Sequence, residues 1–329
     1  MKQKAIIFSG IRPTGKIHIG NYLGAFEHLV ELQKKFFCIC CIVDYHGITT
    51  PFNPKGVKNN IIEMASDLLA IGIDPKKSIL FIQSHVPEHT ELTWIFNTIT
   101  PMSELKRMTQ FKEKSSLHQD YVNVGLFDYP VLMASDILLY KANGVPVGDD
   151  QAQHVELTRT IARKFNGMFG KTFSEPDTIL SAHSRIMSLQ DPSKKMSSSL
   201  GPKHYISLDD SPEIIKQKVM TAVTDTGQEG KEPKSPGVEN LFYLLEEFSS
   251  KKTYHKFQND YKNKKIKYVE LKNAIAKDIA DYFEKFRERR KELSRQPRKV
   301  EKILDGGAKR AKIIAQKTLQ EVKQKMGLI

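Results

Sequence analysis

The stretch that decides the fold covers residues 8–25 and reads FSGIRPTGKIHIGNYLGA. Apolar residues at 5–8 predict a strand before it, and apolar residues at helical spacing predict a helix after it. These helical positions are Tyr22, Leu23, Phe26, Leu29 and Val30. A glycine-rich turn between a strand and a helix lets backbone N–H groups approach an anion. In a parallel sheet this turn lies at the carboxyl end of a strand, so we expect a ligand there.

Residues 10–16 also match the first seven positions of a P-loop, GxxxxGK. A P-loop continues with Ser or Thr, whose hydroxyl binds Mg²⁺, whereas this chain has Ile17. Pro13 also removes one backbone N–H group that a phosphate cradle needs. We therefore do not interpret the stretch as a P-loop.

Strands and helices alternate along the first half of the chain. Apolar runs predict strands at 36–43, 78–83 and 145–147, and helical spacing predicts helices at 57–71 and 153–165. This alternation predicts a parallel sheet with right-handed crossovers. We expect an α/β, Rossmann-like domain over residues 1–190, with a helical insertion at about 87–144.

The second half of the chain has helical patterns separated by polar loops. Helices are predicted at 206–223, 239–248, 271–293 and 300–326. We expect a mobile loop at 191–205, which contains the sequence KKMSSS at 194–199. A smaller all-helical domain should cover 206–299, and a terminal helix at 300–329 should pack back on the first domain.

The positive charge is concentrated in the last quarter of the chain. The net charge is +13, and residues 251–329 hold 24 Lys or Arg against 10 Asp or Glu. The first 250 residues hold 27 Lys or Arg against 28 Asp or Glu and are therefore nearly neutral. This charge indicates either a solvated, Lys-rich helical surface or a module that binds a polyanion.

Other features of the sequence indicate where the protein is located in the cell and whether its cysteines bind a metal. The chain has no run of 18 apolar residues, and its first residues, MKQK, lead directly into a predicted strand. We therefore expect no membrane span, no signal peptide and a cytoplasmic location. Cys38, Cys40 and Cys41 alternate along a strand and point to both faces, so we expect buried apolar residues and no metal site.

Five ordered motifs resemble those of the bacterial tryptophanyl-tRNA synthetases, a family of class I aminoacyl-tRNA synthetases. GIRPTG at 10–15 with HIGNYLGA at 18–25 resembles the first class I signature, HIGH, and KMSSS at 195–199 resembles the second, KMSKS. The other three motifs are MTQFKEK at 108–114, YPVLMASDIL at 129–138 and VPVGDDQAQHVELTR at 145–159. The resemblance extends over essentially the whole chain and is weakest after residue 225.

The resemblance implies a ligase. Such an enzyme activates L-tryptophan with ATP to tryptophanyl-AMP and pyrophosphate, and then transfers tryptophan to tRNA(Trp). The substrate carboxylate attacks the α-phosphorus, so the protein contributes positioning and charge neutralisation. The resemblance also implies a homodimer through the insertion, anticodon binding by residues 206–299, and Mg²⁺ carried by the ATP phosphates.

The resemblance assigns three groups of site residues. The catalytic group is Lys195, Lys114, His18 and Asn21. The ATP-binding group is Arg12, Pro13, Thr14, His18, Gly20, Asn21, Gly148, Asp149, Asp150, Ile186, Lys195, Met196, Ser197, Ser198 and Ser199. The tryptophan-binding group is Asp136, Tyr129, Met133, Gln151, Phe8 and His46.

Asp136 is the residue on which we base amino-acid specificity. Helical spacing places Tyr129, Met133 and Asp136 on one face. An indole ring has one N–H donor and no acceptor, so an ionised carboxylate complements it. The alternatives are a surface carboxylate at Asp136 and an ordinary strand-end histidine at His46.

Two positions depart from the family pattern. Arg12 stands where many members carry Gln, and Ser198 stands where KMSKS has its second Lys. Lys194 compensates for that missing lysine only if the loop turns it inward.

Two other functions stay open. A tyrosyl-tRNA synthetase would need a second polar partner for its substrate hydroxyl, and Met133 supplies none. A catalytically silent RNA-binding paralogue is supported only by Ser198.

Overall fold

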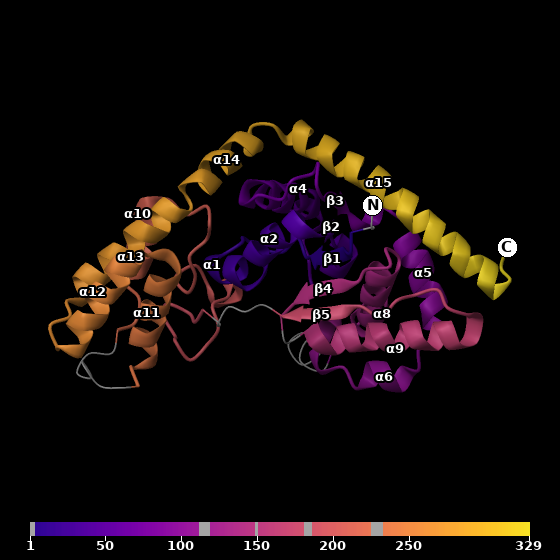
Figure 1. Cartoon of the computed structure of the whole chain (residues 1–329), viewed down its shortest axis with the longest axis horizontal. Helices are drawn as coiled ribbons and strands as arrows, with labels where there is room; N and C mark the ends of the chain where they lie inside the picture. Colours follow the sequence, from indigo (N-terminus) through magenta and orange to yellow (C-terminus); the bar gives the residue numbers. More distant parts are fainter. Residues whose placement is uncertain (1–3, 112–118, 149–150, 181–185, 225–232) are drawn as a thin grey trace. The chain divides into compact units, whose positions relative to one another are not determined.

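The computed structural model describes residues 4–111, 119–148, 151–180, 186–224 and 233–329. The chain forms two compact units (Figure 1). The first comprises Met1–Thr14, Ala25–Ser181 and Leu293–Ile329, and the second comprises Gly15–Gly24 and Ala182–Glu292. The sequence did not indicate that Gly15–Gly24 belongs with the C-terminal helices.

A parallel sheet of five strands forms the centre of the first unit (Figure 1). Its strands are β1 (Ile6–Ile11), β2 (Phe37–Ile42), β3 (Ile79–Ile82), β4 (Gly144–Val147) and β5 (Asp177–Leu180), in the order β3-β2-β1-β4-β5. The predicted Rossmann-like parallel sheet is confirmed. Strand β5 was not predicted, because its four residues are exposed or half-buried and form no apolar run.

Helices follow the strands of the first unit. They are α2 (Glu27–Lys35), α3 (Asp44–Gly47), α4 (Pro54–Ile71), α5 (Glu88–Asn97), α6 (Met102–Lys106), α8 (Val124–Leu138), α9 (Ala152–Phe169) and α15 (Pro297–Met326). The long helix α15 packs on β3, α4 and α5. A Cβ at Gly307 of α15 would lie 1.9 Å from the carbonyl oxygen of Leu80, so this close contact requires glycine.

The helix predicted after the glycine turn is divided into three pieces. A short helix α1 (Ile19–Asn21) leads into a π-helical turn η1 (Tyr22–Phe26), and α2 follows. Such turns occur mostly as single-turn bulges inside α-helices, frequently at functional sites. Here the bulge lies where the chain passes from the second unit to the first, at Gly24 and Ala25.

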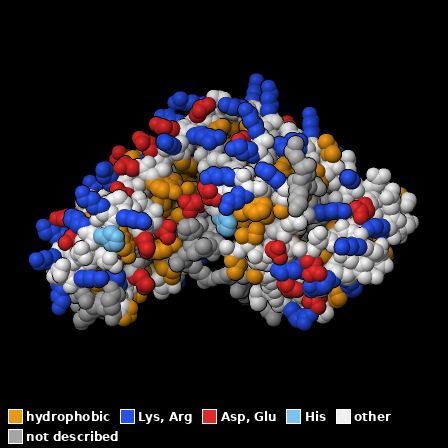
Figure 2. Space-filling view, in the orientation of Figure 1, with side chains coloured by type: hydrophobic (Ala, Val, Ile, Leu, Met, Phe, Trp, Pro, Cys, Tyr) orange, Lys and Arg blue, Asp and Glu red, His pale blue; other side chains and the backbone are white. Residues whose placement is uncertain are grey.

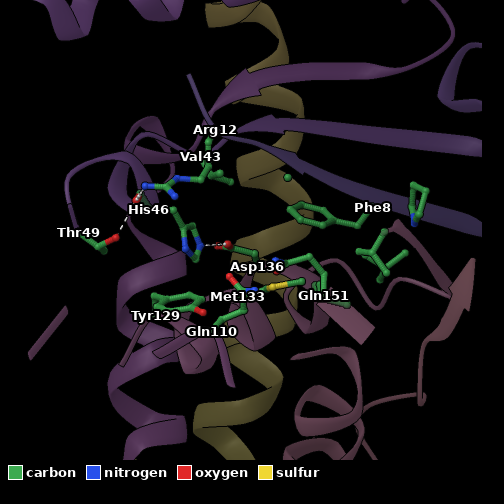
Figure 3. Close-up of a pocket in the computed structure, with 15 residues that line it drawn as sticks. Phe8, Arg12, Val43, His46, Thr49, Gln110, Tyr129, Met133, Asp136 and Gln151 are labelled. Carbon is green, nitrogen blue, oxygen red and sulfur yellow. Dashed lines mark hydrogen bonds and ion pairs between the residues drawn. The ribbon is translucent and has the colours of Figure 1, made fainter. Parts of the chain in front are cut away.

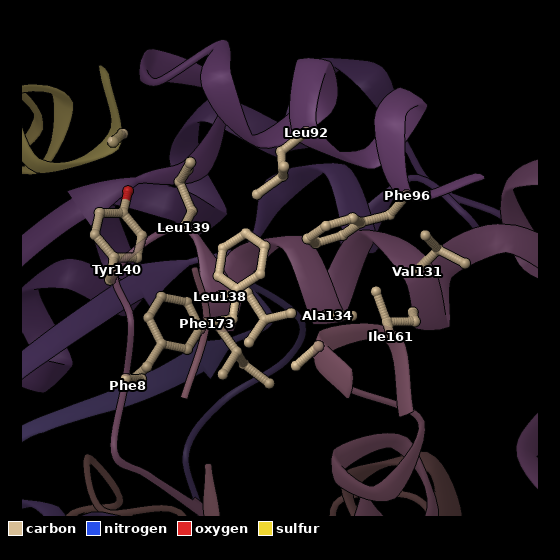
Figure 4. Packing of buried hydrophobic residues seen from close by; sticks show 14 of the residues in the cluster. Phe8, Leu92, Phe96, Val131, Ala134, Leu138, Leu139, Tyr140, Ile161 and Phe173 are labelled. Atoms are coloured by element: carbon tan, nitrogen blue, oxygen red, sulfur yellow. The ribbon is translucent and has the colours of Figure 1, made fainter. Parts of the chain in front are cut away.

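The core of the first unit lies between the sheet, α5, α8 and α9 (Figure 4). The rings of Phe8 and Tyr140 are stacked with centroids 5.7 Å apart. Phe96, Phe165 and Phe173 pack edge to face with one another. Fully burying an aromatic ring of this kind stabilises a fold by about 1.5–3 kcal/mol. This core supports the strand ends at which the site is built.

The described part of the second unit is mostly helical. Its helices are α10 (Pro212–Met220), α11 (Pro236–Phe248), α12 (Lys251–Lys262), α13 (Tyr268–Tyr282) and most of α14 (Glu284–Ser294). The helix predicted at 206–223 begins only at Pro212, where Ser211 is the N-cap. The helix predicted at 271–293 is two helices, because the chain turns at Phe283, and α12 was not predicted because polar residues dominate it. No helix among the described residues is long and apolar enough to cross a membrane.

Candidate active site

A cavity of about 350 Å³ opens at the carboxyl ends of β1 and β4 in the first unit. The order of the strands reverses at this point of the sheet, which is where open α/β folds bind ligands. Its lining residues are Phe8, Gly10, Arg12, Val43, His46, Thr49, Gln110, Tyr129, Met133, Asp136, Ile137, Val145, Pro146, Val147 and Gln151. All six residues assigned to tryptophan binding are among them.

Asp136 lies at the base of a buried hydrogen-bond network. Its side chain is buried, with 1% exposure, which excludes the surface alternative. Its Oδ2 atom accepts a hydrogen bond from His46 Nε2 at 2.8 Å, as Figure 3 shows. Its Oδ1 atom accepts from Gln83 Nε2 at 2.7 Å and from His89 Nδ1 at 2.6 Å.

The network keeps Asp136 ionised. Burial by itself raises the pKa of this carboxyl, but hydrogen bonds from His46 and His89 more than offset burial, so its pKa lies below its ordinary value. The site therefore presents a buried negative charge whose acceptor positions are mostly occupied. His46 is part of this network, which argues against an ordinary histidine at a strand end.

Helix α8 supplies four of the residues that line the cavity, the last of which is Ile137. It begins at the N-cap Asn123, whose side chain accepts a hydrogen bond from the Leu126 N–H group. Tyr129, Met133 and Asp136 then follow on the face that borders the cavity (Figure 3). The Tyr129 hydroxyl lies 2.9 Å from His154 Nε2 on α9, which fixes the ring beside the cavity.

Arg12 contributes a positive charge to the same cavity. Its Nη2 atom donates to the His46 carbonyl oxygen at 2.9 Å and to Thr50 Oγ1 at 3.2 Å. Its Nε atom is buried and has no hydrogen-bond partner among the described residues. Burial lowers the pKa of this guanidinium, which nevertheless stays charged at neutral pH. A half-buried guanidinium with a buried, unused N–H group is suited to bind an anion.

In the second unit, His18 is the N-cap of α1. Its Nδ1 atom accepts from the Asn21 N–H group at 3.2 Å, and Asn21 Oδ1 accepts from the His18 N–H group at 3.3 Å. Burial, with a smaller effect from Lys195, lowers the pKa of His18 to about 4, so the ring is neutral at pH 7. Because Nδ1 is an acceptor, Nε2 carries the proton and is a donor.

The KMSSS segment lies in the same unit as His18. Lys195 pairs with Met187 in an antiparallel bridge, and the Met196 N–H group donates to the Ile186 carbonyl at 2.9 Å. Ser197 caps the turn Ser198–Leu200. The Ser198 Oγ atom lies 3.3 Å from the position of a Cβ at Gly15, so this loop contacts the glycine turn. Lys194 instead pairs with Asp191 at 3.0 Å.

The ATP-binding residues assigned from the sequence are divided between the two units. The first unit contains Arg12, Pro13, Thr14 and Gly148, and the second contains His18, Gly20, Asn21, Ile186, Lys195, Met196, Ser197, Ser198 and Ser199. Lys114, Asp149 and Asp150 lie outside the described residues. Within the described ranges, no group of three or more His, Cys, Asp or Glu side chains is placed to hold a metal ion.

Gln83 and His89 were missed by the sequence analysis. Gln83 follows the apolar strand β3, and a polar residue at the carboxyl end of a parallel strand was the signal that could have identified it. His89 had no such signal, because it lies in the first turn of a helix and contacts Asp136 across 47 residues of sequence.

Comparison with known proteins agrees with this geometry. Residues 1–284 match the family described as tRNA synthetases class I (W and Y). Tryptophan--tRNA ligases from Caldanaerobacter subterraneus subsp. tengcongensis and Helicobacter pylori are each 46% identical to this chain, over 98% and 99% of both sequences respectively. Tryptophanyl-tRNA synthetase from Campylobacter jejuni, in a crystal structure with ADP and tryptophan, superposes with a TM-score of 0.87 at 34% identity, over 98% of this chain and 99% of that one.

The matches to these relatives cover nearly the full length of both aligned sequences. The motifs on which the resemblance was based all fall within the matched residues. The resemblance inferred from the sequence is therefore confirmed. The chain belongs to the class I tRNA synthetases of the tryptophan and tyrosine group, and within that group to the tryptophan--tRNA ligases.

Proposed function

We propose that the chain activates L-tryptophan with ATP and transfers it to tRNA(Trp). The observation that carries the substrate assignment is the buried, ionised Asp136 at a cavity whose other walls are largely apolar or aromatic. An indole N–H group is the donor that such a carboxylate binds, and Phe8 and Met133 offer apolar surface to the ring. Relatives that are 46% identical to this chain are named tryptophan--tRNA ligases.

A tyrosine substrate fits this cavity less well. A phenol hydroxyl both donates and accepts, so a site that selects it needs a donor as well as Asp136. Met133, at the same face of α8, provides no donor. The indole ring, with one N–H donor and no acceptor, leaves no polar group without a partner.

In this proposal, Arg12, His18 and Lys195 are the residues that neutralise charge on the reacting groups. A carboxylate oxygen of tryptophan attacks the α-phosphorus of ATP, and the bond from that phosphorus to the oxygen bridging to the β-phosphate breaks. Pyrophosphate leaves, and Mg²⁺ carried by the ATP phosphates would neutralise part of its charge. Arg12 is suited to the substrate carboxylate or the α-phosphate, and the His18 Nε2 donor and the Lys195 ammonium are suited to the phosphates. In the second step a terminal ribose hydroxyl of tRNA attacks the acyl carbon, and AMP leaves.

The second unit supplies the binding surface for tRNA in this proposal. Figure 2 shows Lys and Arg side chains over the visible surface of the C-terminal helices. We assign anticodon binding to residues 206–299, in which α14 carries Arg287, Arg289 and Arg290. Phosphate contacts supply a large share of affinity for nucleic acid. A chain that charges tRNA belongs in the cytoplasm, where we place it.

A homodimer through residues 87–144 is supported by apolar side chains on this part of the first unit. Trp94 on α5 is 73% exposed, Met102 on α6 is 62% exposed, and Val124 at the start of α8 is 80% exposed. A contiguous exposed apolar patch marks a protein–protein contact, and all three residues lie within the segment proposed as the interface. We therefore propose that a second copy covers them.

Pyrophosphate exchange tests the proposed function. Labelled pyrophosphate should enter ATP in the presence of L-tryptophan and not in the presence of L-tyrosine. Exchange with tyrosine alone would identify a tyrosyl-tRNA synthetase, and no exchange with any amino acid would identify a silent RNA-binding paralogue. Reversing the charge of Arg287, Arg289 and Arg290 together should weaken tRNA charging and its salt dependence while exchange persists.

A further inference from the structure

The side chain behind Asp136 is His89, which does not line the cavity. Its side chain is completely buried on the first turn of α5. One ring nitrogen, Nδ1, lies 2.6 Å from Asp136 Oδ1, and the other, Nε2, lies 2.8 Å from the Tyr140 hydroxyl. The rings of Phe81 and Tyr140 contact it with centroids 5.9 and 5.5 Å away. His89 therefore links a core tyrosine to the carboxylate of the site.

The donor toward Asp136 follows from the charge of the carboxylate. An ionised carboxylate only accepts, so His89 Nδ1 carries a proton and donates it to Asp136. Burial raises the pKa of Tyr140 well above its ordinary value, so its hydroxyl stays protonated. A phenol hydroxyl can donate or accept, so Tyr140 satisfies His89 Nε2 whichever of the two atoms carries the shared proton. His89 therefore donates to Asp136 and is itself held by Tyr140, with every buried polar atom of the link satisfied.

The two oxygens of Asp136 are used unequally. Oδ1 accepts two hydrogen bonds, from Gln83 and His89, and Oδ2 accepts one, from His46. A carboxylate has about four acceptor positions, two on each oxygen. Gln83 is itself held, because its Oε1 atom accepts from the Tyr45 N–H group at 3.2 Å. With respect to the described residues, the one open position is on Oδ2, the oxygen that also accepts from the cavity-lining His46.

We propose that His89, oriented by Tyr140, is a positioning residue for tryptophan selection, because it holds Asp136 Oδ1 and leaves the open position of Oδ2 for the indole N–H group. This inference rests on the proposed function, in which Asp136 binds that group. Without His89 the carboxylate has a free position on each oxygen and a side chain that can rotate, so its attraction for one N–H donor at one place is weakened.

The test compares L-tryptophan with benzothienylalanine, in which sulfur replaces the indole N–H group. Dissociation constants are measured by calorimetry for the full chain. In the wild type, tryptophan should bind about 10- to 150-fold more tightly, the effect of a hydrogen bond to a charged group. In His89→Leu this ratio should fall by about 10-fold. In His89→Asn, whose side-chain amide can donate from nearly the position of Nδ1, most of the ratio should return.

Two further variants complete the test. Tyr140→Phe keeps the ring and removes only the hydroxyl, so it remains informative if His89→Leu does not fold, and the ratio should fall about 2- to 10-fold. His85→Leu, a half-exposed histidine close by that pairs with Asp305, is the matched control and should leave the ratio unchanged.

Three outcomes separate the inferences. If His89→Leu and Tyr140→Phe weaken both ligands equally, the ratio is unchanged, His89 has only a structural role and the inference is overturned. If the ratio falls in His89→Leu and is not restored in His89→Asn, donation from the Nδ1 position is not what His89 contributes, and the inference is also overturned. If the wild type does not distinguish the two ligands, it is the indole assignment of Asp136 within the proposed function that fails.

Discussion

The cavity of the first unit, which we propose binds the amino acid, and the signature loops of the second unit are built in opposite ways. The cavity surrounds a carboxylate with three hydrogen bonds from elements far apart in sequence, and its central atoms are buried. The loops consist of short contiguous segments, His18–Asn21 and Lys195–Ser199, in which the hydroxyls of Ser197 and Ser199 bond mainly to each other and to nearby backbone.

The difference matches the two tasks that we propose for these regions. Selecting one side chain requires a fixed acceptor in a dry cavity, because an unmatched polar group there is costly. Stabilising charge on phosphates requires cations and donors that act at the transition state, and loops can bring them up when substrate is bound. We therefore expect changes in the cavity to act on KM for tryptophan, and changes in the loops to act on kcat.

The largest effect is expected for Lys195→Ala. Loss of this cation should slow adenylate formation on the order of 10²-fold or more, with little change in KM for tryptophan, because it acts on charge that develops on the phosphates. Single-turnover kinetics measure this rate. Lys194→Ala is the matched control, since Lys194 pairs with Asp191. If Lys194→Ala slows adenylate formation strongly and Lys195→Ala does not, the role belongs to Lys194, and the assignment to Lys195 is wrong.

The next effect is expected for Asp136→Ala, on the cavity side of the comparison. KM for tryptophan should rise about 10- to 150-fold, the value of a lost hydrogen bond to a charged group, while KM for ATP changes little. Steady-state exchange kinetics with each substrate varied in turn measure both constants. An unchanged KM for tryptophan in a folded variant would contradict the assignment, and circular dichroism verifies the fold.

A third prediction concerns His18, a residue of the signature loops that is as buried as the residues around the cavity. Its pKa is about 4 in the folded chain and about 6.5 when unfolded, so the unfolded chain binds more protons between these values. The unfolding free energy should therefore fall as the pH drops from 6.5 to 4, by on the order of 2–3 kcal/mol.

The control for this pH effect is His18→Asn, which retains an N-cap side chain that does not titrate. Urea unfolding of both proteins isolates the contribution of His18 as the difference between their unfolding free energies. That difference should shrink below pH 6.5 and stay constant above pH 7. A difference that is independent of pH would show that the ring titrates normally in the folded chain.

The parts of the molecule that the sequence predicts are the contiguous ones. The apolar strands β2 and β3 and the amphipathic helices α4 and α9 follow from local patterns, and so does the α8 face with Tyr129, Met133 and Asp136. Strand β5 has no apolar run, because its side chains are exposed or half-buried, so only pairing with β4 identifies it. His89 and Gln83 reach Asp136 from separate elements, and such long-range contacts leave no local pattern.

The smallest expected effect, and the sharpest test of the loops, is a gain from Ser198→Lys. The family signature has lysines on both sides of Met-Ser, and here only Lys195 remains. Ser198 Oγ lies 3.3 Å from the Cβ position of Gly15, so residue 198 already faces the glycine turn. A lysine there adds a second cation beside the glycine turn, and we expect adenylate formation to speed up severalfold. This gain is smaller than the roughly 10²-fold effect of a preorganised donor, because a long side chain must be ordered.

Single-turnover adenylate formation measures the gain, with Ser199→Lys as the matched control on the adjacent residue. The prediction is contradicted if Ser198→Lys gives no gain while Lys194→Ala or Lys114→Ala slows adenylate formation strongly. Another lysine would then supply the second positive charge, and the phosphates of ATP would need no further cation.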